Sequence, residues 1–265
     1  SNFNSTSVYL GNKELFMPTE CIPYQKIHYF TRFIADYLNQ RDELKPFYNR
    51  FPELEEFEEQ IEEKERNFTS EKREILVNTL RKQYKNLETS ELTQQNIDLL
   101  LQSNTFTVTT GHQLNLFTGP LYFLYKIASA VNLASELKEK YPYYNFVPVY
   151  WMASEDHDFE EINHFHLDGT KFQWDSKQTG PVGKFQIDQE LQDLMKKAHF
   201  APDFFKKAYL GQNNLSAAVR HYLNHLFGEK GLIILDPDNR DLKSQFIPVI
   251  KDDIIHHKAK GLVDQ

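Results

Sequence analysis

Hydrophobic residues follow two different spacings along this chain, and the change comes near residue 105. Over residues 53–101, apolar side chains recur every three or four positions among charged ones, which predicts amphipathic helices. Beyond that point, short apolar runs alternate with longer helical patterns. We therefore expect a mainly helical region over 1–104, an α/β core over 105–240, and a helix over 241–265 that leads toward a further segment.

Three apolar runs in the second region predict buried strands. They span residues 105–110, 146–153 and 231–235. Near-continuous runs rich in β-branched and aromatic residues are typical of strands that are covered on both faces. The predicted helices between them span about 120–140, 186–210 and 214–227, the last two forming a helical insertion over 186–227. Strands separated by helices predict an α/β fold with a parallel sheet and right-handed crossovers.

The first of these strands runs into a loop, Gly111 to Pro120, that precedes a helix. Thr118 suits the N-cap of that helix, and Pro120 suits its first turn, where a missing N–H costs nothing. Such a strand–loop–helix unit presents free N–H groups that favour a phosphate or carboxylate, although the spacing matches neither the P-loop nor the dinucleotide fingerprint. The predicted binding residues are Gly111, His112, Gln113, Thr118, Gly119, Pro120 and Lys126.

A dense polar segment, residues 154–164, follows the second strand. It holds five carboxylates and two imidazoles in the sequence SEDHDFEEINH. Ligands of open α/β sheets bind at the carboxyl ends of the strands, and clustered acids beside a histidine can transfer protons. Glu160 and Glu161 are better explained as solvated residues at a helix start. The predicted catalytic residues are Glu155, Asp156, His157 and Asp158, and Asn163 is added as a predicted binding residue.

Two other features allow more than one interpretation. His157, His164 and His166 lie close together, but their spacing matches no zinc motif, so no protein-bound metal site is predicted. His164 and His166 could share one face of a strand. The segment from Gly180 to Gly183 is either a hinge beside the site or a plain connector.

The composition excludes some classes of function. The 265 residues carry a formal net charge of −8, which argues against non-specific nucleic-acid binding, since that needs a basic surface. No apolar run reaches the roughly 18 to 20 residues of a membrane span, so no membrane association is expected. The single cysteine, Cys21, can form no intramolecular disulfide and has no histidine at a useful spacing for catalysis. We expect a cytoplasmic protein.

These segments together resemble one known family, the bacillithiol biosynthesis cysteine-adding enzymes, BshC. One difference is that the family more often has glutamine where this chain has His112. The long polar segment after the second strand is the most specific part of the resemblance. The segments that carry it are Thr110–Gln113, Phe117–Tyr122 with Lys126, Pro148–His164, Gly180–Gly183 and Asp236–Asp238.

The resemblance implies a fold and an activity. The fold is a Rossmann-like core related to nucleotidyltransferases and class I aminoacyl-tRNA synthetases, with helical connecting segments and a coiled coil that supports a homodimer. The activity is a ligase reaction that joins L-cysteine to glucosaminyl malate with ATP, and Mg²⁺ held by carboxylates would accompany the nucleotide. Family members are longer, so this chain resembles their amino-terminal half. The alternative is a non-catalytic nucleotide-binding or dimerising module, which a turnover assay on the full-length protein would distinguish.

Overall fold

A computed structural model describes residues 8–10, 13–15, 22–27 and 29–264. Cys21 therefore lies outside the described residues. The chain divides into two compact units, Ser1–Gln60 and Ile61–Gln265.

The amino-terminal unit holds a small hairpin and short helices. Strands β1 (Val8–Leu10) and β2 (Lys13–Leu15) pair antiparallel. Helix α1 (Arg32–Leu38) begins after Thr31, whose hydroxyl accepts a hydrogen bond from the Ile34 N–H and so caps the helix. The remaining elements of this unit are the 3₁₀ turns η1 (Tyr24–Lys26), η2 (Asp42–Phe47) and η3 (Leu54–Glu56), followed by α2 (Phe57–Asn67), which continues into the second unit.

The second unit is built on a three-stranded parallel sheet. Its strands are β3 (Thr105–His112), β4 (Asn145–Met152) and β7 (Ile233–Leu235), in the spatial order β3-β4-β7. The register pairs Val108 with Pro148 and Tyr150 with Ile234. The three predicted strands and their parallel arrangement are confirmed.

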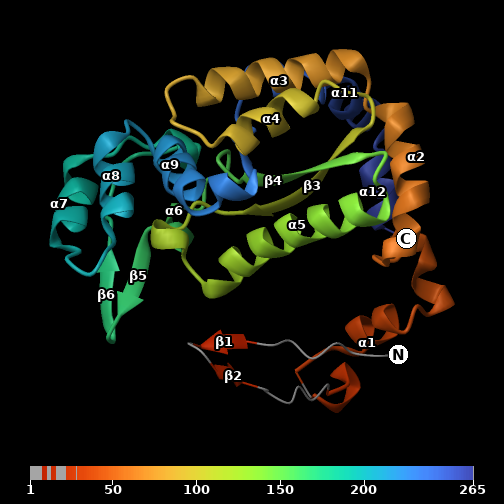
Figure 1. Ribbon diagram of the computed structural model, residues 1–265, viewed down its shortest axis with the longest axis horizontal. Coiled ribbons are helices and arrows are strands. Elements are labelled where there is room, and N and C mark those ends of the chain that lie inside the picture. The colour runs from red at the N-terminus through yellow and green to blue at the C-terminus, as the bar shows by residue number, and fades with distance from the viewer. Residues whose placement is uncertain (1–7, 11–12, 16–21, 28, 265) are drawn as a thin grey trace. The chain divides into compact units, whose positions relative to one another are not determined.

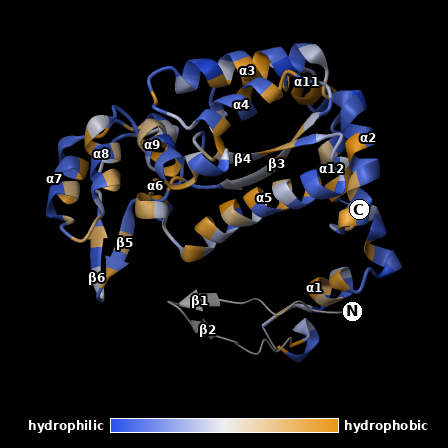
Figure 2. Cartoon of the chain, in the orientation of Figure 1, coloured by the Kyte–Doolittle hydropathy of each residue, from blue (hydrophilic) through white to orange (hydrophobic). Residues whose placement is uncertain are grey.

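Helices cover both faces of this sheet (Figure 1). On one face, α5 (Leu121–Lys140) and α9 (Leu215–Phe227) pack against Tyr150 and Met152. On the other face, α3 (Ser70–Tyr84) and α4 (Glu91–Leu99) pack against Val147 and Val149. Alternate residues of β4 therefore enter opposite cores, which explains its near-continuous apolar sequence. Hydrophobic residues also recur along α5 (Figure 2).

A buried arginine joins α3 to the start of β3. Arg73 is 2% exposed, and its guanidinium donates to the carbonyl oxygens of Leu100, Ser103 and Thr105 at 2.8 to 3.0 Å. Its Nε donates to the Phe68 carbonyl at 3.2 Å, and the guanidinium lies over the Phe68 ring. Burial lowers the pKa of Arg73. The charge is thus solvated by backbone carbonyls, and it satisfies those of the chain between α4 and β3.

The helices of the remaining chain differ from the predicted ones in one place. The single helix predicted over 186–210 is two helices, since the chain turns at Ala198–Pro202, and Pro202 occupies the N-cap of the second. The helix over 214–227 is confirmed, with Asn214 as its N-cap. The remaining elements are η4 (Leu116–Thr118), α6 (Phe159–Ile162), β5 (His164–Leu167), β6 (Thr170–Gln173), η5 (Val182–Lys184), α7 (Gln189–Lys197), α8 (Asp203–Gly211), η6 (Gly228–Lys230), α10 (Arg240–Ser244), α11 (Ile247–His256) and α12 (Lys258–Val263).

The boundary between the two compact units lies at Gln60–Ile61, whereas the predicted helical region extends to residue 104. Helices α3 and α4, which fall within the helical region predicted for 1–104, belong to the same unit as the sheet and cover one of its faces. None of the described helices is both long enough and apolar enough to cross a bilayer.

Candidate active site

The two predicted site segments leave the sheet side by side. His112 at the end of β3 pairs in register with Met152 at the end of β4, and the Ala153 N–H donates to the His112 carbonyl at 3.1 Å. The Tyr150 hydroxyl donates to the same carbonyl at 2.9 Å. The loops after β3 and β4 therefore meet at the carboxyl edge of adjacent parallel strands, as expected when each loop directly follows a strand of one parallel sheet. This edge is where open α/β sheets bind ligands.

The loop between β3 and α5 contains a tight left-handed turn. Phe117 and Thr118 have φ values of 51° and 74°, and Thr118 is 7% exposed. An N-cap residue needs an extended backbone, so the prediction that Thr118 caps α5 is wrong. Pro120, predicted within the first turn, is itself the N-cap and offers no side-chain acceptor. Because of this, the first N–H groups of α5 are left for solvent or a ligand.

Gly119 is explained by the fold. Its backbone has φ 62° and ψ −134°, a region that only glycine occupies readily, and an added Cβ would lie 2.6 Å from the Cβ of Asn115. The absence of a side chain at this position is therefore required by the turn, before any ligand is considered.

We expect Gly119→Ala to lower the free energy of unfolding by about 1 to 3 kcal/mol, the usual cost of a strained backbone. Gly211→Ala is the matched control, because Gly211 ends α8 with no positive φ and no atom within 4 Å of an added Cβ. Urea unfolding of both variants measures the difference. Equal stability of the two variants would contradict the assigned strain.

Three predicted binding residues of this loop already have contacts within the chain. The Lys126 amine donates to the Gly111 carbonyl at 2.9 Å, and the Gln113 amide donates to Glu161 at 3.0 Å. The His112 ring packs between the rings of Tyr122 and Phe123, with centroids 5.3 and 5.2 Å away. Burial, and secondarily the charge of Lys126, lowers the pKa of His112. Both effects favour the neutral form of the imidazole.

This pKa gives a prediction about stability. Below the ordinary imidazole pKa of about 6.5, the unfolded chain binds a proton at His112 that the folded chain resists, so His112 reduces stability as the pH falls through that value. His112→Phe should weaken the loss of thermal stability between about pH 6.5 and 5. His166→Phe, which alters an exposed imidazole, is the control. Parallel pH profiles for His112→Phe and the unaltered chain would refute the prediction.

The acidic loop after β4 is shaped by Asp156. Its Oδ1 accepts the N–H groups of His157 at 2.6 Å and Asp158 at 3.1 Å. This local turn leaves His157 and Asp158 exposed at the start of α6, with Glu155 partly exposed beside them. Asp156 thus stabilises the turn of this loop. The other three predicted catalytic residues, Glu155, His157 and Asp158, have side chains that solvent can reach.

The segment from Gly180 to Gly183 forms a wall of this loop. The Val182 N–H donates to the Asp156 carbonyl at 2.8 Å, and the Gly183 N–H donates to the Ser154 carbonyl at 2.9 Å. A Cβ on Gly183 would lie 2.4 Å from the Ser216 hydroxyl and 2.5 Å from the Cβ of Ser154. Two backbone hydrogen bonds and this close approach favour the connector interpretation over a hinge.

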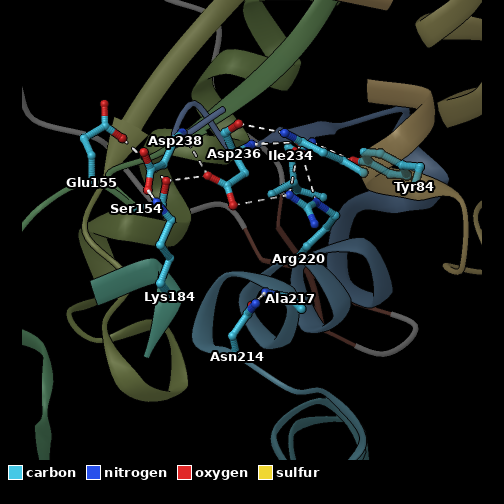
Figure 3. A network of polar contacts seen from close by, with 11 residues as sticks. Tyr84, Ser154, Glu155, Lys184, Asn214, Ala217, Arg220, Ile234, Asp236 and Asp238 are labelled. Carbon is cyan, nitrogen blue, oxygen red and sulfur yellow. Dashed lines mark hydrogen bonds and ion pairs between the residues drawn. The ribbon is translucent and has the colours of Figure 1, made fainter. Parts of the chain in front are cut away.

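A polar network continues the edge from β4 to β7 (Figure 3). The Ser154 hydroxyl donates to the Asp236 carboxylate at 2.5 Å, and Arg220 approaches the other oxygen of Asp236 at 4.0 Å. Asp238 pairs with Lys184 at 2.7 Å and with Lys243. Burial alone would raise the pKa of Asp238, but the two lysines outweigh it and hold this pKa below its ordinary value.

Comparison with known proteins assigns the chain to a family. The sequence model described as "Bacillithiol biosynthesis BshC, N-terminal Rossmann-like domain" matches residues 17–265. The chain belongs to this family. Relatives carrying the name "Putative cysteine ligase BshC" include proteins of Flavobacterium psychrophilum, 53% identical over 257 residues, and Flavobacterium johnsoniae, 54% identical over 247 residues. A Bacillus cereus relative of the same name is 29% identical over 252 residues.

The matched region is only part of these BshC relatives. It covers 93% of this chain but 48% of the Flavobacterium psychrophilum protein, and 90% of this chain but 47% of the Flavobacterium johnsoniae protein. For the Bacillus cereus protein the values are 88% and 46%. The chain spans about half the length of the curated relatives it matches.

Within this BshC domain, one predicted residue lies apart from the others. Asn163 is 5% exposed at the start of β5, where its side chain contacts the ring of His164 at 3.0 Å. It lines a polar hollow of its own with Glu160 and Lys171. His164 and His166 share a strand face, with ring centroids 5.7 Å apart. In the described part of the chain, no three histidine, cysteine or acidic residues are grouped as metal ligands.

The site residues predicted from the sequence did not include the β7 end of the candidate site. Ser154, Lys184, Arg220, Asp236, Asp238 and Lys243 were not among the predicted site residues. A signal was present, since Asp236-Pro237-Asp238 follows the third buried strand just as the other two segments follow theirs. What the sequence did not show is that Ser154, from the β4 loop, would be the partner of Asp236.

Proposed function

We propose that this chain is the amino-terminal, Rossmann-like half of a cytoplasmic ligase that joins L-cysteine to glucosaminyl malate through an amide bond. The observation that carries the proposal is the meeting of the β3 and β4 loops at one carboxyl edge, in a family whose relatives are named as cysteine ligases. A homodimer of the full-length protein through a coiled coil belongs to the same proposal.

The proposed reaction sets two requirements on the site. A carboxylate forms an amide at neutral pH only after activation, which ATP supplies when bound, and the attacking amine must lose a proton. His157 and Asp158, which are the exposed groups at the end of the loop after β4, would accept that proton. Glu155 and Asp158 would attract the ammonium group of a substrate before it reacts.

The loop after β3 is the part of the chain that fits an anionic cofactor. Helix α5 begins without a side-chain cap, so its first N–H groups and its dipole favour a phosphate. Beside it, His112 Nε2 is buried without a hydrogen-bond partner among the described residues. ATP would be held here by Gly111–Pro120 and Lys126, and Mg²⁺ by the carboxylates of the acidic loop.

A chimera tests the proposal. It joins residues 1–265 of this chain to the unmatched carboxyl-terminal half of the Flavobacterium psychrophilum relative. With L-cysteine, glucosaminyl malate, ATP and Mg²⁺, we expect the chimera to form a new thiol-containing amide. Thiol labelling and mass spectrometry detect this product. Omission of each component in turn gives the controls, and the nucleotide product, AMP or ADP, identifies how the carboxylate is activated.

The same assay separates the ligase from a non-catalytic module. A module that only binds nucleotide would bind ATP in calorimetry but form no amide in the chimera. Folding of the chimera is checked by its thermal unfolding. A folded chimera that forms no product with all components present would count against the ligase proposal.

A further inference from the structure

A polar hollow lies along α6, the short helix that follows the acidic loop. Its volume is about 440 Å³, and small-molecule sites have roughly 300 to 1,000 Å³. Helix α6 begins directly after Asp158, and the β5–β6 hairpin continues from its other end (Figure 1). The hollow is thus adjacent to the candidate site but is built from other side chains. Those that line it include Phe159, Glu160, Asn163, Lys171, Gln173 and Asp175.

Asn163 brings a buried donor to this hollow. The residue is 5% exposed, and its Oδ1 lies 3.0 Å from the Nδ1 of His164. Among the described residues, no hydrogen-bond partner is recorded for its Nδ2. The Trp174 N–H donates to the Asn163 carbonyl at 2.7 Å, which holds the residue in place. Buried amide donors are almost always paired, so this one is left for an acceptor that enters the hollow.

Two side chains of opposite charge also line the hollow without a partner. Neither Lys171 nor Glu160 has a side-chain hydrogen bond or ion pair within the described part of the chain, and both are exposed. Asp175 uses one carboxylate oxygen to accept the Gln173 amide at 2.6 Å. Carboxylates and amides accept hydrogen bonds from hydroxyl groups, whereas an ammonium group binds a carboxylate. The hollow therefore suits a ligand that has hydroxyl groups and an anionic end.

The polar face of the hairpin continues the hollow beyond Lys171. The register of β5 and β6 pairs His164 with Gln173 and His166 with Lys171, so these four side chains share one face. The Cβ atoms of directly opposed residues lie about 5 Å apart, so both histidines border the hollow. An imidazole N–H can donate to a carboxylate. Donors for an anion are thus concentrated at the hairpin end, away from the acidic loop.

The other end of the hollow reaches the candidate site. A helix rises about 1.5 Å per residue, so Asn163 lies about 7 to 8 Å from Asp158 along α6, and Glu160 lies between them. The partly exposed Phe159 ring packs on Trp174, with centroids 4.9 Å apart, and offers an apolar wall to the C–H groups of a sugar ring. A ligand of this length contacts both the hairpin and the acidic loop.

We propose that this hollow binds the amino-sugar substrate of the ligase, with its dicarboxylate end at the hairpin and its amine at the acidic loop. Lys171 and the Nδ2 of Asn163 bind the carboxylates, and Glu160 and Asp175 accept the sugar hydroxyls. The amine then lies beside Asp158, and the loop after β3 is left for the nucleotide. This inference rests on the proposed function, because it gives one of the two joined substrates, glucosaminyl malate, a place in this chain.

Initial rates of the chimera test the assignment. Lys171→Met keeps an apolar stem but removes the charge. It should raise KM for glucosaminyl malate by about 10-fold, the lower end of the range for a hydrogen bond to a charged group, because the side chain is exposed. KM for L-cysteine and for ATP should not change. Lys197→Met, which alters an exposed lysine at the end of α7 and outside the hollow, should leave all three constants unaltered. An unchanged KM for glucosaminyl malate in Lys171→Met would overturn the proposal.

A second variant addresses the buried donor. Asn163→Leu removes the Nδ2 donors and keeps a side chain of similar size. In a variant whose unfolding temperature stays close to that of the unaltered chimera, KM for glucosaminyl malate should again rise by about 10-fold, with KM for L-cysteine constant. An equal rise in both constants would assign Asn163 a structural role and contradict its contact with the ligand. If Asn163→Leu does not fold, the surface variant Lys171→Met decides.

Calorimetry separates this inference from the ligase proposal. The lining residues all belong to this chain, so the 265-residue protein should bind glucosaminyl malate, and Lys171→Met should weaken that binding by about 10-fold. Glucosamine, which lacks the carboxylates, should bind equally to both proteins. This pattern of binding without amide formation by the chimera would refute the ligase but support the assigned ligand. No binding by the 265-residue protein, or equal affinity in Lys171→Met, would overturn the inference even if the chimera forms the amide.

Discussion

Arg73→Met is expected to lower the free energy of unfolding by about 3 to 5 kcal/mol. The substitution keeps an apolar stem of similar length but removes the donors to four buried or partly buried carbonyl oxygens, those of Phe68, Leu100, Ser103 and Thr105. Each buried acceptor left without a donor costs about 1 to 3 kcal/mol, and part of that cost is recovered by water or local movement. Urea denaturation followed by circular dichroism measures the change.

Arg81→Met on the same helix is the matched control. Arg81 makes an ion pair with Asp98 at 2.7 Å, but the two side chains are 53% and 64% exposed. Exposed pairs contribute about 0 to 1 kcal/mol, so this variant should unfold close to the unaltered chain. Similar losses for Arg73→Met and Arg81→Met would show that the carbonyl cluster around Arg73 adds little to stability.

Asp156→Asn is expected to lower the turnover of the chimera by about 100- to 1,000-fold, the usual effect of removing one group that stabilises charge in a transition state. The amide keeps an oxygen that can accept the His157 and Asp158 N–H groups, so the turn should persist while the negative charge is lost. Initial rates of amide formation with saturating substrates measure the change, and the thermal unfolding temperature should stay nearly constant.

Asp168→Asn controls for the substitution itself. Asp168 lies in the turn between β5 and β6 with φ 49°, a conformation that asparagine tolerates well, and it is outside the candidate site. Its turnover should match that of the unaltered chimera. Near-normal turnover of Asp156→Asn would remove Asp156 from the charge-stabilising role and leave it as the residue that shapes the loop.

The features that sequence predicted well are those encoded by neighbouring residues. The apolar runs of β3, β4 and β7 and the three-to-four spacing of the helices reflect burial that repeats with the period of each element. The parallel pairing of these strands could be predicted because a helix separates each strand from the next in the sequence. From this it also followed that the loops after β3 and β4 share one edge, since the carboxyl ends of parallel strands lie together.

The features that only the tertiary structure decided depend on contacts between distant residues or on local backbone strain. Thr118 has the composition of an N-cap, but the chain must turn sharply between β3 and α5, and the left-handed turn that results buries it. In the sequence, Arg73 is one of several charged residues of a predicted helix. Only the structure shows that it is buried among carbonyl groups 27 to 32 residues away.

The candidate site shows the same division. Its acidic loop and its glycine-containing loop were visible in the sequence because each follows its own strand directly. The bond from Ser154 to Asp236, 82 residues later, was not, because it depends on the register of β4 against β7. Periodicity records which face of an element is buried, whereas register and the direction of each crossover are settled by packing of the whole core. The sequence by itself therefore determined the strands, most of the helices and two loops of the site, and the packed sheet decided how the loop after β7 joins them.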